Sequence, residues 1–135
     1  MKRITTDVKV AKYRNFTYLC LKFSLKNFET IFLEAANEFI ASLDKKSASK
    51  VFYNIDLAEQ TNDTKIFKKL QDEIWEFRSK YLGNQHRLLA FGDKSNNRNT
   101  LVIATHGFIK KTSKVPKNEI HKAEKIRSEY FSSKK

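Results

Sequence analysis

The spacing of hydrophobic positions changes several times along the chain, and each change marks a predicted element. Residues 16–25 form a run rich in aromatic residues that predicts a strand. Over 28–43 the spacing is helical, and Asn27 is the expected N-cap. A second helix is predicted over 45–59 with Asp44 as its cap. Because so short a link joins the two helices, we expect an antiparallel hairpin. The apolar stripe of the first helix is Phe28, Ile31, Phe32, Ala35, Phe39, Ile40 and Leu43, and that of the second is Ala48, Val51, Phe52, Ile55 and Ala58.

The second half of the chain alternates in the manner of strands. Strands are predicted over 74–81, 87–91 and 101–106, with a turn at Gly83-Asn84 and a loop from Gly92 to Asn97. In the first of these strands the charged side carries Glu76, Arg78 and Lys80. A last helix is expected to begin near Pro116 and to bury Ile120, Ala123, Ile126 or Arg127, and Tyr130. The predicted fold is therefore α+β: an N-terminal strand, a two-helix hairpin, an antiparallel three-stranded meander and a C-terminal helix.

Composition limits the class of protein. The 135 residues suit one domain, which we place at 16–135 after a basic arm at 1–15. Only three glycines occur and they lie far apart, which excludes a glycine-rich phosphate loop. The single Cys20 cannot form an internal disulfide and is interpreted as a small buried hydrophobe, in keeping with a reducing cytoplasm. Apolar runs of four residues are too short for a membrane span.

Charge is distributed unevenly along the chain. The net charge is +12, and residues 1–28 and 107–135 each carry +6, whereas the segment between them is neutral. Two basic ends around a neutral body indicate a polyanionic partner that contacts the ends, with the middle devoted to folding. The alternative is that lysine-rich composition serves only solubility.

Several kinds of chemistry are not indicated. The acidic residues show no convergent metal-ligand pattern, and the three histidines have no ligand spacing, so no metal or other cofactor is expected. The sequence contains no Ser/His/Asp or Cys/His pattern of a hydrolase for esters or peptides.

Cationic residues on predicted strands and loops are the chemistry that remains. Arg78 and Arg87 fall on neighbouring strands, and guanidinium groups bind phosphate through paired hydrogen bonds. His106 ends the third predicted strand, and the segment after it carries Lys110, Lys111 and Lys114 together with Phe108, which is suited to stacking on a base. Each feature has a structural alternative. Arg78 could pair with Glu76 or Asp72, Arg87 could lie on the sheet surface, His106 could bond a backbone carbonyl, and Phe108 could belong to the core.

These residues carry a resemblance to a known family. Trp75-Glu76-Phe77-Arg78, His86-Arg87-Leu88-Leu89-Ala90-Phe91 and the long block from Thr105 to Pro116 resemble the HigB-like branch of the RelE toxin superfamily. Glu119-Ile120-His121-Lys122-Ala123 is similar to the helix that follows in that branch. The resemblance covers about residues 16–131.

The resemblance implies the toxin of a type II toxin–antitoxin system, a ribosome-dependent endoribonuclease that cleaves translated mRNA in the cytoplasm without a metal. It also implies two partners, mRNA on the ribosome and a HigA-like helix-turn-helix antitoxin. In this chemistry the 2′-OH of the RNA attacks the adjacent phosphate, and the enzyme supplies positioning, proton transfer and charge stabilisation.

By position in the matching blocks, Arg87 and Lys111 are expected to stabilise the phosphorane, and His106 to transfer a proton. Arg78, Phe108, Lys110 and Lys114 are expected to bind RNA. Some relatives use a tyrosine near the C-terminal helix; Tyr130 lies there, but no motif places it in the site. The competing class is a noncatalytic basic module that binds RNA or the ribosome, and its binding would weaken steeply with salt.

Overall fold

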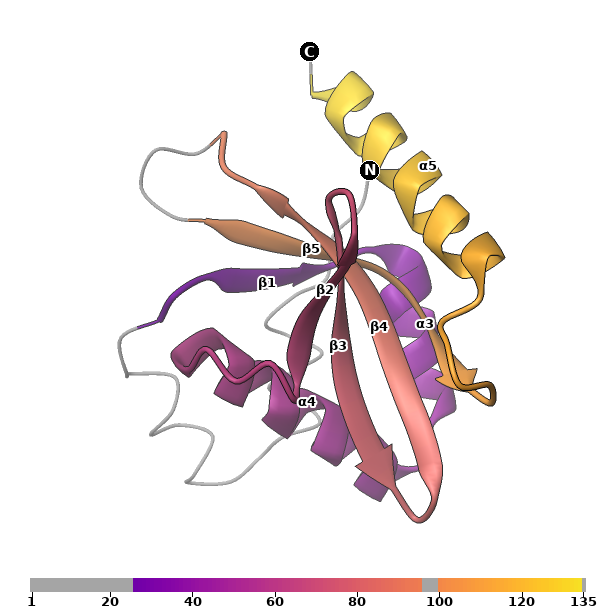
Figure 1. Ribbon diagram of the computed structural model, residues 1–135. Coiled ribbons are helices and arrows are strands. Elements are labelled where there is room, and N and C mark those ends of the chain that lie inside the picture. Colours follow the sequence, from indigo (N-terminus) through magenta and orange to yellow (C-terminus); the bar gives the residue numbers. More distant parts are fainter. Residues whose placement is uncertain (1–25, 96–99, 135) are drawn as a thin grey trace.

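The computed structural model describes residues 26–95 and 100–134. The predicted arm 1–15, the predicted strand 16–25 with Cys20, and Asn96-Asn97 of the predicted loop lie outside the described residues. The elements, in chain order, are β1 (Glu29–Phe32), α3 (Glu34–Ser42), α4 (Lys45–Gln60), β2 (Phe67–Gln71), β3 (Ile74–Tyr81), β4 (Asn84–Asp93), β5 (Leu101–Lys110) and α5 (Lys117–Ser133) (Figure 1).

One mixed sheet organises the described part of the chain. Its five strands lie in the order β1-β5-β4-β3-β2, with β1 parallel to β5 and every other pair antiparallel. The α+β class is confirmed, but the sheet order differs from the prediction because the meander has four strands, β2 to β5. Strand β2 was missed because its sequence, Phe-Lys-Lys-Leu-Gln, has no regular apolar alternation.

The predicted helix over 28–43 is confirmed for its second part, which forms α3, but wrong for its first part, where Glu29–Phe32 is the strand β1. Thr30, Ile31 and Phe32 are all buried, and β1 is hydrogen-bonded in parallel register to 101–104. Ile31 and Phe32 pack into cores on opposite faces of the sheet, as successive residues of a strand do. A short apolar run buried on both faces fits either period, so spacing alone gave the wrong element. The predicted cap Asn27 is likewise wrong, since its amide donates to the Glu59 carbonyl ahead of the strand.

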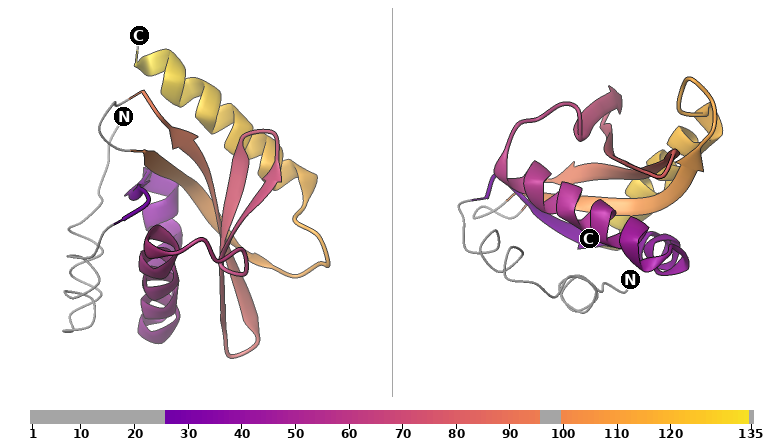
Figure 2. Two further views of the ribbon diagram at one scale, coloured as in Figure 1. Left: turned by 60° about the vertical axis from the view of Figure 1, so that its left-hand side comes forward. Right: turned by 90° about the horizontal axis from the view of Figure 1, so that it is seen from below.

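Helices cover both faces of the sheet (Figures 1 and 2). The first core lies between the sheet and α3 and α4, and it contains Ile40, Phe52, Phe77 and Leu88. The second core lies under α5 and contains residues of β3, β4 and β5. Figures 1 and 2 show α3 and α4 leaving their junction at a wide angle, so the predicted antiparallel hairpin is wrong. Helix α3 packs mainly against β5 and α4 mainly against β3, and the two helices make few contacts with each other.

Two helix predictions are confirmed. Helix α4 runs over Lys45–Gln60, and the Asp44 carboxylate accepts a hydrogen bond of 3.1 Å from the Ser47 amide, which otherwise has no partner in the first turn. Its predicted stripe is buried. Helix α5 begins directly after Pro116 and buries Ile120, Ala123 and Tyr130 as expected.

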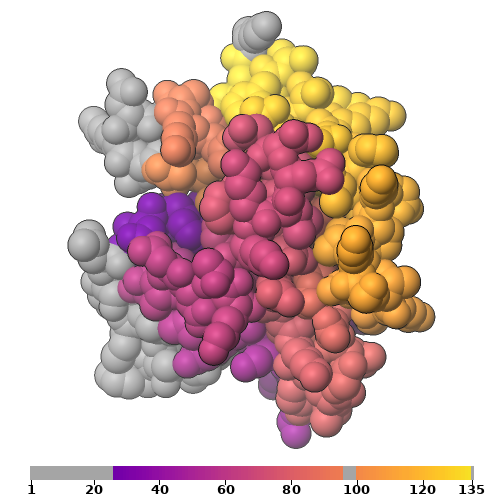
Figure 3. Space-filling model, viewed as in Figure 1, coloured from indigo at the N-terminus to yellow at the C-terminus, as the bar shows by residue number. Residues whose placement is uncertain are grey.

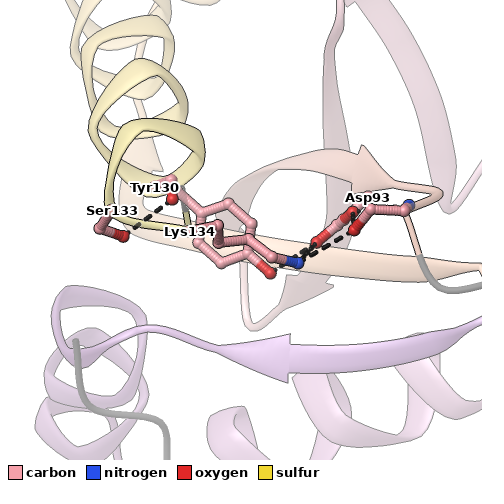
Figure 4. A network of polar contacts seen from close by, with 5 residues as sticks. Asp93, Tyr130, Ser133 and Lys134 are labelled. Carbon is pink, nitrogen blue, oxygen red and sulfur yellow. Dashed lines mark hydrogen bonds and ion pairs between the residues drawn. The ribbon is translucent and has the colours of Figure 1, made fainter.

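The far end of α5 is held to the sheet by a polar network (Figure 4). Asp93, at the end of β4, is fully buried and accepts hydrogen bonds from the Tyr130 hydroxyl at 2.7 Å and the Lys134 ammonium at 2.8 Å. Ser95 donates to the same carboxylate through its hydroxyl at 2.6 Å. The Tyr130 hydroxyl thus donates its proton to a hydrogen bond with the Asp93 carboxylate.

Candidate functional site

Strand register brings the predicted arginines together. Arg78 on β3 lies directly opposite Arg87 on β4, and Arg87 lies opposite Phe108 on β5. Directly opposed residues of antiparallel strands share a face, so these three form one row across the sheet. Lys80 and Lys110 both lie opposite Gln85 and form the next row. Both rows lie on the face that α5 covers.

Strand β5 is longer than predicted, and this changes where its residues lie. Residues 107–110 continue the pairing with β4 as far as Gln85–Lys110, rather than leaving the strand as a basic loop. Phe108 and Lys110 are therefore fixed by the sheet. Lys111 and Lys114 lie on the connection to α5 and are exposed. Within residues 26–95 and 100–134, no ion pair joins either lysine to the strands.

Glu76 is the buried anion around which the arginines gather. Its carboxylate lies 3.1 Å from Nε of Arg87 and 3.7 Å from Nε of Arg78. Arg87 also donates to Oε1 of Gln85 at 2.7 Å and to the His86 carbonyl at 3.3 Å. The Arg87 side chain is 3% exposed and the Arg78 side chain is 33% exposed. Arg87 is thus held rigidly, while Arg78 extends to solvent and also contacts Glu76, one of the two pairings named as its structural alternative.

Positive charge exceeds negative charge at this place. Burial lowers the pKa of Lys110, and the nearby guanidinium groups of Arg87 and Arg78 and the Lys68 ammonium lower it further, against the opposing effect of Glu76. Burial also lowers the pKa of Arg87, again opposed by Glu76. We call Arg78, Arg87 and Lys110 around Glu76 the cation cluster. A cluster of this kind, partly withdrawn from water, favours an anionic ligand.

His106 is engaged on both sides of its ring. Nδ1 lies 3.0 Å from the Thr105 hydroxyl, and Nε2 lies 2.9 Å from a Glu119 carboxylate oxygen on the first turn of α5. The residue is 3% exposed, and burial lowers its pKa although Glu119 acts in the opposite direction. In this geometry His106 ties β5 to α5. Its role in proton transfer stays a prediction, as do the roles of the other site residues.

Phe108 is half-buried and packs against the second core, with its ring 6.2 Å from that of His106. Sequence reasoning missed Lys68 and Gln85 as neighbours of the site. Lys68 was missed because β2 was not predicted, and Gln85 because β4 was expected to begin later. The available signal for the role of Glu76 was its spacing, since it lies two residues before Arg78 and so falls on the same side of the strand.

The described residues form neither a candidate metal site nor a candidate membrane span. Among residues 26–95 and 100–134, no three His, Cys, Asp or Glu side chains converge in a way that could hold a metal ion. None of the helices that the structure describes is both long and apolar enough to cross a membrane.

Fold and site together define the class: a small α+β protein whose mixed sheet carries a partly buried cluster of cations. Residues 38–128 match the model of the phage-derived protein Gp49-like family, and because this match spans more than half of the chain, the protein belongs to that family. The family is associated with RelE-like toxins, and the match therefore suggests a toxin of the toxin–antitoxin type with an antitoxin as partner. No curated protein and no solved structure shows significant similarity to the chain.

Proposed function

We propose that this protein is the toxin of a type II toxin–antitoxin system, of the HigB-like branch, and that it cleaves translated mRNA on the ribosome without a metal. The observation that carries the proposal is the cation cluster, because it gathers three positive charges around one buried carboxylate on a face built by three strands. Membership of a toxin-associated family supports the same function. The expected partners are the ribosome with its mRNA and a helix-turn-helix antitoxin, and the expected location is the cytoplasm.

In the proposed reaction the 2′-oxygen of a ribose forms a bond to the adjacent phosphorus, and the bond from phosphorus to the 5′-oxygen of the next nucleotide breaks. A base removes the proton of the 2′-OH, and an acid protonates the 5′-oxygen that leaves. The phosphorane between these events carries extra negative charge. Arg87 is proposed to stabilise that charge from a position fixed by Glu76 and Gln85, which is what electrostatic preorganisation requires.

The more exposed cations are proposed to contact RNA first. Arg78 and Lys110 bind backbone phosphate beside Arg87, while Lys111 and Lys114 supply charge from the connection to α5. Phe108 offers a partly exposed ring to a base. Burial and the neighbouring guanidinium groups lower the pKa of Lys110, and a phosphate bound beside it would relieve this repulsion between cations. His106 would need to separate from Glu119 before it could exchange a proton with RNA.

A noncatalytic RNA- or ribosome-binding module is the second candidate, and one observation favours it. His106, the predicted group for proton transfer, is buried with both ring nitrogens engaged. Such a module would bind phosphate through the same cations and leave RNA intact.

Mapping RNA 5′ ends after induction in cells tests the proposal, with translation either running or blocked. Wild-type protein should generate new ends only during translation, and an Arg78→Gln/Lys110→Gln variant should reduce them at least tenfold. Lys125→Gln, a change at an exposed residue of α5, should cleave as the wild type does. Ribosome binding without new RNA ends would reject cleavage and leave the binding module.

A further inference from the structure

A second basic surface lies next to the cation cluster, on the side of α4. A pocket of about 480 Å³ is lined by five cations, and no Asp or Glu is among its lining residues. We call it the α4 pocket. Its cations are Lys50, Lys65, Arg78, Lys80 and Arg87. The family resemblance drew attention to Arg78 and Arg87 but gave no role to the three lysines.

The pocket exists because β2 covers only part of β3. Pairing between the two strands begins at Phe67–Phe77, and one further hydrogen bond of 2.8 Å joins the Arg78 amide to the Ile66 carbonyl. Beyond that point the edge of β3 faces α4, where Asn54 donates to the Arg78 carbonyl at 2.9 Å. Figure 1 shows the connection after α4 running back along the helix to β2, and this path brings Lys65 to the strand edge.

The charges of the α4 pocket are largely uncompensated. Arg78 and Arg87 share Glu76, as described above. Lys50, Lys65 and Lys80 form no ion pair within the part of the chain that the structure describes. The Lys50 ammonium lies 5.8 Å from the centre of the Tyr53 ring. Like charges around one cavity repel each other, so an anion bound there relieves the repulsion.

A buried hydroxyl provides an independent sign of a ligand. Ser79 lines the α4 pocket and is 6% exposed, and its Oγ has no hydrogen-bond partner among the described residues. His86, directly opposite on β4, is also buried, and its Nδ1 is equally unpartnered within that part of the chain. Ser79 and His86 both line a smaller cavity beside the pocket. Buried polar atoms almost always have a partner, so a donor left over in a basic pocket points to an acceptor such as a phosphate oxygen.

We propose that the α4 pocket binds a backbone phosphate of single-stranded RNA, next to the phosphate held by the cation cluster. The proposal rests on the proposed function, because Arg78 and Arg87 line the pocket and also belong to the cluster, so one continuous strand can occupy both places. The strand passes from the α5-covered face around the edge of β3 toward α4. In Figure 3, α4 and the β3–β4 hairpin adjoin on the surface turned toward the viewer.

Binding of a 2′-O-methyl RNA 12-mer to the full chain tests the proposal, because this probe cannot be cleaved. Each phosphate contact on a single strand contributes about 0.7 to the slope of log affinity against log salt. Lys50→Gln/Lys65→Gln should reduce the slope by about 0.7 and weaken binding several-fold at low salt. Lys45→Gln/Lys46→Gln removes the same charge from exposed positions at the start of α4 and should change neither quantity. Ser79→Ala, which is neutral, should weaken binding without changing the slope.

The outcomes separate the two proposals once circular dichroism shows that each variant is folded. A wild-type slope for Lys50→Gln/Lys65→Gln, together with a reduced slope for Arg78→Gln, would show that RNA stays on the strand face. The pocket would then be rejected and the proposed function would stand. If neither variant changes the slope, both the α4 pocket and the cation cluster are rejected as RNA-binding sites. If Lys45→Gln/Lys46→Gln reduces the slope and the affinity as much as Lys50→Gln/Lys65→Gln does, the effect is a general one of charge. This result would also overturn the proposal that the pocket binds RNA.

Discussion

Replacing Asp93 by asparagine is predicted to destabilise the fold by about 3 kcal/mol. The carboxylate is fully buried and accepts hydrogen bonds of 2.7 Å from Tyr130 and 2.8 Å from Lys134. Hydrogen bonds to a charged group contribute about 1.5–3 kcal/mol each. An amide can accept from Ser95 and donate to the Tyr130 hydroxyl, but it removes the charge opposite Lys134, so only part of the loss is recovered.

The same residue should make stability depend on pH. Burial raises the pKa of Asp93, but the hydrogen bonds from Lys134, Ser95 and Tyr130 outweigh it and hold the pKa well below its ordinary value of 3.8. A carboxyl group with a depressed pKa in the folded state stabilises the protein fully above the pKa of the unfolded chain. This contribution is lost as pH falls below that value toward the folded pKa. Asp93→Asn should lack this part of the acid dependence.

Urea denaturation followed by fluorescence of Trp75, the single tryptophan, measures both effects. Glu38→Gln removes an exposed carboxylate of α3 and serves as the control, with a change within about 0.5 kcal/mol. If Asp93→Asn unfolds within about 0.5 kcal/mol of the wild type at neutral pH and keeps the wild-type acid slope, the reasoning is refuted.

Three further predictions follow from single positions. Gly107→Ala should destabilise the fold by about 1–3 kcal/mol in urea denaturation, because the added methyl group would collide with the Phe39 ring, whereas Gly92→Ala meets only a carbonyl at 4.0 Å and serves as its control. Lys110→Arg keeps the positive charge that is proposed to bind backbone phosphate, so it should still cleave RNA in the 5′-end assay, whereas Lys110→Gln should lose most cleavage; equal losses in the two variants would contradict a role for this charge. Leu82 has φ 50° in the β3–β4 turn and is 84% exposed, so Leu82→Asn should raise the melting temperature, and a lower one would contradict this account of the turn.

The parts of the fold that could be predicted from the sequence are those with a long or clear hydrophobic period. Helix α4 with its Asp44 cap, strand β3 and the buried stripe of α5 were all placed correctly, because each is amphipathic over several turns or alternations. Strand β1 was mistaken for helix because a run of only three buried residues, which faces both sides of the sheet, fits either period. Strand β2 was missed because its pairing with β3, rather than its own pattern, makes it a strand.

The candidate site, like the fold, could be predicted from the sequence only in part. Blocks of sequence identified Arg78 and Arg87 and placed them on adjacent strands, which is confirmed, and the register shows in addition that they lie directly opposite each other. Only the structure shows that they share Glu76, and that His106 is bound to Glu119. These contacts depend on strand register and on the docking of α5, which local patterns do not encode.

By itself, the sequence determined the α+β class, the basic character of the protein and its likeness to a toxin family. It also indicated a neutral middle segment devoted to folding, with cations concentrated at the two ends of the chain. The tertiary structure shows that this middle segment also forms a basic surface, since all five cations of the α4 pocket lie between residues 50 and 87. Charges that cancel along the chain are separated in space, because the folded sheet buries Glu76 between two arginines and turns the lysines of α4 and β3 toward one edge. Net charge over a segment sums its residues, whereas a ligand responds to the charges that the fold brings within its reach.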